Sequence, residues 1–181
     1  MRKVTYGGAV SLDGFLAGPG EALDWLRWSN DAAKISMESF RGVDTMLMGR
    51  KTFEIGQRMG GGPPMKGVKT YVFSRRLQRL PEGVEGELIG EDAAEFVRRI
   101  KGEPGGGILV MGGGEIGSAL IEAGLVDEVG LSIHPVLLGG GTPTFLPFSR
   151  RVELELIETR PIARDCVLVR YRVAPPAPSP P

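Results

Sequence analysis

Short apolar runs alternate along this chain with stretches in which apolar residues recur at helical spacing. The runs that predict buried strands are residues 3–11, 44–48, 68–73, 87–89, 108–111 and 128–133. Helices are predicted over residues 30–40, briefly after Gly49, over residues 92–101 and over residues 116–123. Two final segments, residues 152–159 and 166–173, alternate apolar and polar positions and predict an antiparallel hairpin. This order indicates an α/β fold with a mixed sheet, parallel in the middle and antiparallel at one edge.

Capping residues mark the ends of these helices. Asn30 or Asp31 is predicted to cap the first helix, and Asp92 to cap the third in a capping box with Glu95. Gly124 is the expected C-terminal stop of the fourth helix. The proline-rich residues 174–181 suit neither a helix nor a ladder and are predicted to be disordered, which leaves residues 1–173 as a single domain.

Composition excludes several classes of function. The chain has 181 residues, with 22 Lys and Arg against 22 Asp and Glu, so no basic excess points to nucleic acid or to an anionic membrane. The N-terminus is a poor signal peptide, and apolar stretches are too short to span a membrane. The single cysteine, Cys166, cannot form an intramolecular disulfide, which fits the cytoplasm. The sequence offers no metal-ligand spacing, and the only histidine, His134, is expected to be structural or exposed.

Two glycine-bearing turns follow apolar runs and open helical patterns. The first contains Gly49, and the second contains Gly112, Gly114 and Gly117 in the spacing G-x-G-x-x-G. A strand that ends at a helix N-terminus leaves free N–H groups that suit phosphate, and glycine lets phosphate oxygens approach the main chain. Two such turns suggest a dinucleotide ligand, although a plain tight turn is the alternative. A standard Rossmann domain would carry its fingerprint in the first turn.

Cations and hydroxyls adjoin these turns. Arg50, Lys51 and Thr52 follow Gly49 at a helix start, where cations are unfavourable unless an anion binds nearby. The alternative is a solvated basic turn. Ser74, Arg75 and Arg76 follow the end of a strand and suit an exposed phosphate monoester such as the 2′-phosphate of NADP, with an ordinary charged turn as the alternative.

Five ordered segments give the whole chain a resemblance to a known family. They are residues 9–14, 48–54, 72–75, 111–114 and 127–141. Together they resemble the dihydrofolate reductase superfamily, and within it the reductase domain of bacterial riboflavin biosynthesis. The resemblance implies a three-layer α/β fold with helices on both faces of a mainly parallel central sheet and a C-terminal antiparallel hairpin. Because these 181 residues contain neither the deaminase pattern nor the zinc-ligand set of the two-domain enzyme, we expect a stand-alone reductase-type domain.

The resemblance also implies where NADPH binds. Gly49, Arg50, Lys51 and Thr52 would hold phosphates, and Ser74 and Arg75 would hold the 2′-phosphate with Arg76 in a secondary role. The turn of Gly112, Gly113, Gly114, Glu115, Ile116 and Gly117 would hold the pyrophosphate. Ala9 and the loop that begins at Leu12 would border the nicotinamide.

The substrate side rests on fewer residues. Asp31 is similar in order to the acid that binds the pterin ring in folate reductases, with a plain helix cap as the alternative. Ile35 and Ser132 would then lie near the substrate, and Asp13 is a second candidate acid. These residues predict an NADPH-dependent reductase of a small heterocyclic or carbonyl-type substrate. A non-catalytic NADP(H)-binding or assembly module is the alternative. The apolar residues 135–138 and 145–148, together with the resemblance, predict a homodimer.

Overall fold

The computed structural model describes residues 1–60, 67–81 and 86–175. Most of the proline-rich tail, residues 176–181, lies outside this described part, and so do residues 61–66, where the second helix was expected to end. The described strands are β1 (Val4–Ser11), β2 (Phe15–Ala17), β3 (Val43–Gly49), β4 (Lys69–Phe73), β5 (Gly86–Ile89), β6 (Gly107–Met111), β7 (Glu128–His134), β8 (Thr142–Pro143), β9 (Leu154–Ile162) and β10 (Cys166–Val173). The helices are the 3-10 turn η1 (Pro19–Glu21), α1 (Asn30–Ser39), α2 (Arg50–Arg58), α3 (Ala93–Lys101) and α4 (Gly114–Glu122).

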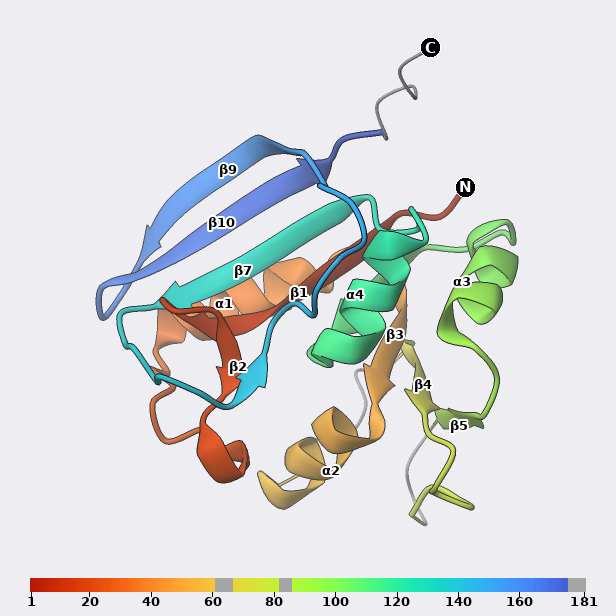
Figure 1. The fold of residues 1–181 in the computed structure, drawn as a ribbon, viewed down its shortest axis with the longest axis horizontal. Helices are drawn as coiled ribbons and strands as arrows, with labels where there is room; N and C mark the ends of the chain where they lie inside the picture. The colour runs from red at the N-terminus through yellow and green to blue at the C-terminus, as the bar shows by residue number, and fades with distance from the viewer. Residues whose placement is uncertain (61–66, 82–85, 176–181) are drawn as a thin grey trace.

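An eight-stranded sheet forms the centre of the molecule, in the order β5-β4-β3-β6-β1-β7-β10-β9 (Figure 1). Neighbouring strands from β5 to β7 are parallel, whereas β10 runs antiparallel to β7 and to β9. The mixed sheet with a closing antiparallel hairpin is therefore confirmed. A small second sheet pairs β2 with β8, and the sequence pattern did not predict either of these two short strands.

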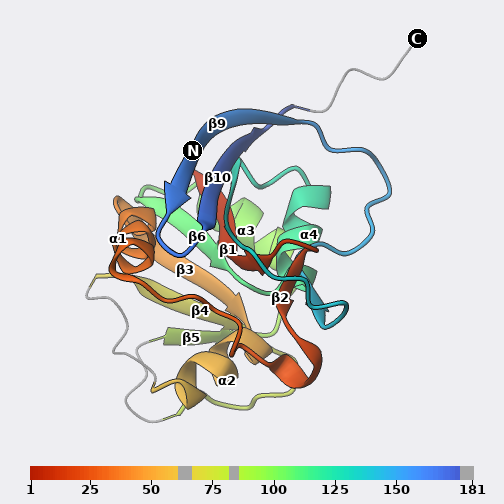
Figure 2. The ribbon, with the colours of Figure 1, turned by 90° about the vertical axis from the view of Figure 1, so that its left-hand side faces the viewer.

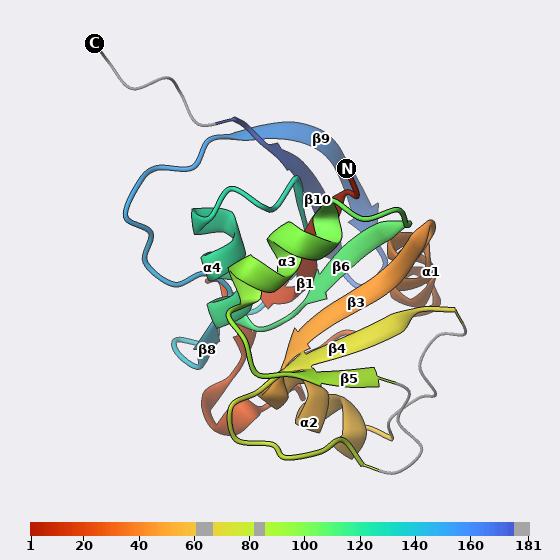
Figure 3. The same cartoon turned by 90° about the vertical axis from the view of Figure 1, so that its right-hand side faces the viewer.

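Helices cover both faces of the sheet. On one face, α3 and α4 bury Phe96, Val97 and Leu120 against Leu47 and Val110 of the strands (Figure 3). On the other face, α1 packs through Ile35 on the β9–β10 hairpin, and α2 packs through Phe53 on β3 and β4 (Figure 2). Two covered faces explain why the central strands are apolar throughout instead of alternating.

The structure confirms two of the predicted helix ends and contradicts a third. The carboxylate of Asp92 accepts hydrogen bonds from the N–H groups of Ala94 and Glu95, at 2.8 and 3.1 Å, so its capping role is confirmed. Gly124 has a φ of +68°, as a C-terminal stop requires. The predicted cap of α1 is wrong by one or two residues, because the cap is Ser29, whose Oγ accepts from the N–H of Ala32 at 3.1 Å. Serine is as good a cap as asparagine or aspartate, so the sequence alone did not separate them.

Candidate functional site

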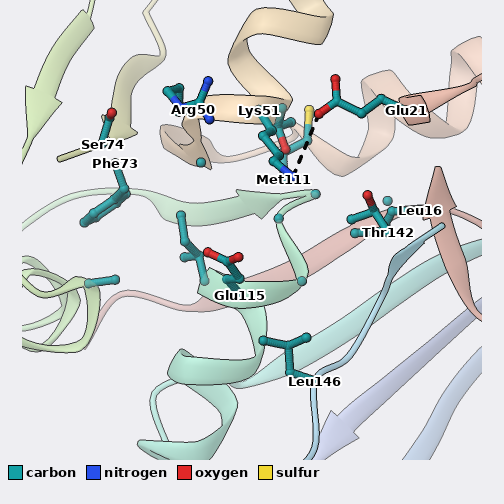
Figure 4. Close-up of a pocket in the computed structure, with 18 of the residues that line it drawn as sticks. Leu16, Glu21, Arg50, Lys51, Phe73, Ser74, Met111, Glu115, Thr142 and Leu146 are labelled. Carbon is teal, nitrogen blue, oxygen red and sulfur yellow. Dashed lines mark ion pairs between the residues drawn. The ribbon is translucent and has the colours of Figure 1, made fainter. Parts of the chain in front are cut away.

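A cavity of about 1070 Å³ opens at the carboxyl-terminal edge of the parallel strands. Its walls come from the ends of β1, β3, β4 and β6 and from the beginnings of α2, α3 and α4. Figure 4 shows Ser74 at one end of this cavity and Leu16 and Thr142 at the other, with Arg50 and Lys51 between them. We call these the Ser74 end and the Leu16 end. An elongated cavity at this edge of an α/β sheet is where such folds bind ligands.

Two helix N-termini meet at the middle of the cavity. Because β3 and β6 are neighbours in the sheet, the helices that follow them begin side by side. A Cβ atom placed on Gly113, the N-cap of α4, would lie 3.7 Å from the backbone nitrogen of Gly49, the N-cap of α2. Within the described residues, neither helix receives a side-chain cap, whereas α1 and α3 both do. The first N–H groups of α2 and α4 therefore remain free for an anion.

Glycines make this meeting point possible. Gly112 and Gly113 have φ values of +56° and +66°, which residues with a side chain rarely adopt. A Cβ atom on Gly112 would lie 2.9 Å from Oγ1 of Thr52, so the turn packs directly against the first turn of α2. A Cβ atom on Gly114 would overlap the carbonyl oxygen of Pro143 in β8. The glycines thus bring three segments together around free backbone N–H groups.

Gly117, the last glycine of the motif, has a different role. It does not belong to the cavity lining, and a Cβ atom there would overlap the ring of Tyr6 on β1. The ring is fully buried, and its hydroxyl donates to the carbonyl of Thr144 at 2.7 Å. Burial raises the pKa of Tyr6, so the phenol stays neutral. Gly117 therefore allows α4 to pack closely on the sheet.

The cations of α2 differ in how strongly they are paired. The guanidinium of Arg50 donates to both carboxylate oxygens of Glu54, at 2.8 and 2.7 Å, one turn later in the helix. The ammonium of Lys51 lies 4.0 Å from the carboxylate of Glu21, which also accepts from Arg58 at 2.9 Å (Figure 4). The hydrogen bond from Arg58 lowers the pKa of Glu21, so this carboxylate is ionised. Lys51 is the more available of the two cations, since its ion pair is long and exposed.

The Ser74 end carries two more cations. Ser74 follows β4, and its Oγ accepts hydrogen bonds from the N–H groups of Arg76 and Leu77, at 3.1 and 2.9 Å. These bonds occupy the oxygen lone pairs and fix the turn, while the hydroxyl hydrogen remains able to donate. Arg75 and Arg76 are exposed and line the cavity. Asp92, the cap of α3, lies on the same rim.

The Leu16 end is mainly aliphatic. Its lining includes Ala9 of β1 and Leu16 of β2, together with Leu23 and Leu26 from the segment before α1 and Thr142 from β8. The sequence did not point to these leucines, because an isolated leucine in a loop carries no motif. It also missed Glu21, whose contact with α2 joins residues far apart in the chain.

Most of the predicted cofactor-binding residues share this cavity, while the predicted substrate-side residues do not. The predicted cofactor-binding residues that line the cavity are Ala9, Gly49, Arg50, Lys51, Thr52, Ser74, Arg75, Arg76, Gly112, Gly113, Gly114, Glu115 and Ile116. The candidates outside the lining are Leu12, Asp13, Asp31, Ile35, Gly117 and Ser132.

The substrate-side candidates have other partners. Asp31 lies in the first turn of α1, with 56% of its side chain exposed, 3.9 Å from Lys34. Ile35 is buried against Ile162, Cys166 and Leu168 of the C-terminal hairpin. On the cofactor side, Leu12, which was predicted to border the nicotinamide, is 64% exposed.

Asp13 joins two loops. Its carboxylate accepts from the hydroxyl of Ser11 at 2.6 Å and from the N–H groups of Leu138 and Gly139, at 3.0 and 2.7 Å from Oδ2. These hydrogen bonds, the one from Ser11 first, lower the pKa of Asp13. The carboxylate is therefore committed to holding the loop after β7 against the turn after β1.

The described residues contain neither a candidate metal site nor a candidate membrane-spanning helix. In residues 1–60, 67–81 and 86–175, no cluster of three His, Cys, Asp or Glu side chains could hold a metal ion. Across the same part of the chain, none of the helices has the length and apolar character needed to cross a membrane.

Several known proteins are similar to this chain in sequence or in structure. The uncharacterized protein YyaP of Bacillus subtilis (strain 168) is 32% identical to this chain over 182 residues, covering 94% of this chain and 95% of YyaP. A crystal structure of a putative riboflavin biosynthesis protein from Shewanella sp. PV-4 matches with a TM-score of 0.83 at 23% identity, covering 96% and 99% of the two chains. A dihydrofolate reductase from Enterococcus faecalis, complexed with NADP(H), matches with a TM-score of 0.67 at 20% identity, covering 94% and 96%.

These structural likenesses show a dihydrofolate reductase-like α/β fold. The family model named RibD C-terminal domain matches residues 2–168, which include strands β1 to β9, the described helices α1 to α4 and the residues that line the cavity. The chain belongs to the RibD C-terminal domain family.

Proposed function

We propose that this protein is an NADPH-dependent reductase of a small heterocyclic or carbonyl-type substrate. The observation that carries the proposal is the meeting of two uncapped helix N-termini in one cavity that also contains Ser74 and Arg75. A dinucleotide phosphate has a pyrophosphate in its middle and a phosphate monoester near one end. The cavity offers matching donors in the same order.

The residues fit NADPH in one orientation. Free N–H groups of α2 and α4, with Lys51 and Thr52, would hold the pyrophosphate where Gly112 and Gly113 leave no Cβ in the way. Ser74 and Arg75 would hold the 2′-phosphate at the Ser74 end. This orientation leaves the nicotinamide at the Leu16 end, between Ala9 and the aliphatic side chains.

The bound cofactor would supply a hydride at this end. The chain's own contribution is to hold the two rings face to face and to exclude water with Leu16, Leu23 and Leu26. Glu21, an acid that lines the cavity on the same side as Leu16 (Figure 4), is ion-paired with Arg58. We therefore propose that the proton for the product comes from water.

Two further observations support this proposal. The matched reductase from Enterococcus faecalis has its structure determined with NADP(H), which is a property of that protein. The one cysteine is a buried free thiol, which suits the reducing cytoplasm where NADPH is available. We propose that compartment for this protein.

The direct test is NADPH oxidation with a panel of pterins, pyrimidines and small carbonyl compounds. Turnover of at least one compound, lost on Lys51→Met and retained on Lys34→Met, is the expected result, because only Lys51 lines the cavity. NADPH binding without turnover of any compound would favour the alternative of a non-catalytic binding module. Absence of NADPH binding would contradict the proposal.

The position of Asp31 gives a separate expectation. Asp31→Asn should leave turnover within about twofold of the wild type, because the carboxylate lies outside the cavity and faces solvent beside Lys34. Stability should also change little, since the cap of α1 is Ser29. Specific activity and thermal unfolding of the variant measure both. A large loss of turnover with unchanged NADPH binding would instead assign Asp31 to the substrate.

We also propose that two copies of the chain associate. Leu137 and Phe145 remain 71% and 37% exposed in the loops that flank β8. Exposed apolar side chains of this size in ordered loops favour association. Light scattering at micromolar concentration should give twice the chain mass of 19.4 kDa, and Leu137→Asp should shift the mass toward the monomer. A monomer mass for the wild type would refute this proposal.

A further inference from the structure

His134 is a buried residue at the end of β7 and is 4% exposed. Its Nδ1 atom accepts a hydrogen bond from the backbone N–H of Arg27 at 3.1 Å and lies 3.6 Å from Sγ of Cys166. The ring of Trp25 packs edge-on against it, with ring centres 5.3 Å apart and planes at 90°. The imidazole therefore contacts the segment before α1, although that segment lies over a hundred positions earlier in the chain.

Residues 22–29, which we call the pre-helix segment, have no helix or strand of their own. Other hydrogen bonds of this segment stay local or reach a turn: Trp25 donates to Ala22, and the guanidinium of Arg27 donates to the carbonyl of Arg164. In the described part of the chain, the bond from Arg27 N–H to His134 is the one that joins the segment to a strand of the large sheet. Leu23 and Leu26 of the segment line the Leu16 end of the cavity.

We propose that His134 is a positioning residue whose neutral imidazole holds the pre-helix segment in place, so that the Leu16 end keeps its shape only while His134 is unprotonated. Binding of the reacting rings at this end rests on the proposed function above. The contact between His134 and the pre-helix segment is independent of that function.

The tautomer follows from the hydrogen bond. An Nδ1 atom that accepts from Arg27 carries no hydrogen, so the neutral ring has its hydrogen on Nε2. Protonation would place a hydrogen on Nδ1, opposite the N–H of Arg27, and the bond would become a repulsion between two donors. The segment would then lose its tie to the sheet.

The surroundings oppose protonation. Burial, with a smaller contribution from the charge of Arg27, lowers the pKa of His134 below its ordinary value of 6.5.

Other titratable groups lie on the elements around His134. On β10, burial raises the pKa of the Cys166 thiol, so this thiol stays neutral. The turn after β9 adds Arg164 and Asp165, the latter 3.6 Å from the guanidinium of Arg27. On the neighbouring strand β1, Ser11 pairs with His134, and its hydroxyl donates to the carboxylate of Asp13. Ile35 of α1 packs with Cys166 in the apolar cluster beside the imidazole.

The lowered pKa of His134 fixes the direction in which stability changes with pH. Because the pKa in the folded protein is lower than in the unfolded chain, the neutral imidazole contributes stability above pH 6.5. That contribution is lost as the pH falls through the lower, folded-state value. The pre-helix segment should therefore loosen in mild acid while the rest of the sheet stays folded.

The first test uses the fact that His134 is the only histidine. In untagged protein, its ring C–H signals in an NMR titration belong to this residue alone. We expect a midpoint below 6.5, with the backbone amide of Arg27 shifting at the same midpoint. In His134→Asn, where Oδ1 replaces Nδ1 as a fixed acceptor, the Arg27 amide should not titrate. A midpoint at or above 6.5, or an Arg27 amide that does not follow, would overturn the proposal.

The second test measures NADPH binding in the cavity at two pH values. Between about pH 7.5 and about pH 5, NADPH binding by the wild type should weaken about fivefold more than binding by His134→Asn, the equivalent of one lost neutral hydrogen bond. The comparison removes the titration of the cofactor's own phosphate, which both proteins share. His134→Leu should bind weakly at both pH values, and rescue by asparagine separates the acceptor from mere packing. Equal pH dependence in wild type and His134→Asn would refute the effect on the cavity. If NADPH does not bind at any pH, the proposed function fails while the NMR result stands.

Discussion

Arg75→Ala is expected to weaken NADPH binding roughly 10- to 100-fold and to leave NADH binding almost unchanged. NADPH differs from NADH by one phosphate monoester, to which a guanidinium can donate two parallel hydrogen bonds. Hydrogen bonds to charged groups contribute about 1.5–3 kcal/mol each, and about 1.4 kcal/mol corresponds to tenfold in affinity. Arg75 lines the Ser74 end, where Ser74 fixes the turn through its bonds to Arg76 and Leu77.

Titration of both cofactors against the wild type and the variant measures this effect. Arg79→Ala is the matched control, because Arg79 lies in the same loop and carries the same charge but does not line this cavity. It should leave NADPH binding within about twofold. Salt should reduce the preference for NADPH, since the site is exposed. Equal weakening of NADPH and NADH by Arg75→Ala would show that Arg75 has a structural role instead.

Gly117→Ala is expected to destabilise the fold by about 1–3 kcal/mol. The added Cβ would overlap the ring of Tyr6, which is fully buried and held by its hydrogen bond to Thr144. The ring cannot turn away without breaking that bond, so α4 would have to move from the sheet. Because α4 begins at the meeting point of the two helix N-termini, NADPH binding should weaken together with stability.

Gly56→Ala gives a control of the opposite sign. Gly56 also lies inside a helix, but a Cβ atom there would meet no other atom within 4 Å. Alanine is the better helix former, so this variant should gain about 0.5–1 kcal/mol. Denaturant unfolding of the two variants provides the comparison. An unchanged or higher stability of Gly117→Ala would contradict the close packing of α4 on Tyr6.

Local chemistry accounts for what the sequence predicted. Strands such as β6 are apolar because both faces are covered, and a helix such as α3 has a short-range cap in Asp92, so these elements follow from a few neighbouring residues. The turn at Gly112 and Gly114 was also recognisable from its glycine spacing after an apolar run, although the spacing did not single out Gly113, whose φ is +66°. The cofactor side of the candidate site consists of such turns.

The substrate side depends on contacts between distant segments. Asp31 occupies a similar position in the chain order to an acid that faces substrate. Whether it faces the cavity depends on how α1 packs through Ile35 on a hairpin that lies about 130 residues later in the chain. The pairing of β2 with β8 likewise joins two short segments that have no strand pattern of their own. His134 shows the same limit, since its partner Arg27 is identified only by the folded chain.

A crystal structure of the NADPH complex is the most direct measurement. We expect the pyrophosphate against the first N–H groups of α2 and α4, beside Lys51, Thr52 and Gly113. We expect the 2′-phosphate at Ser74 and Arg75, and the nicotinamide at the Leu16 end against Ala9. A cofactor bound in the reverse direction, or bound outside this cavity, would contradict the central claim.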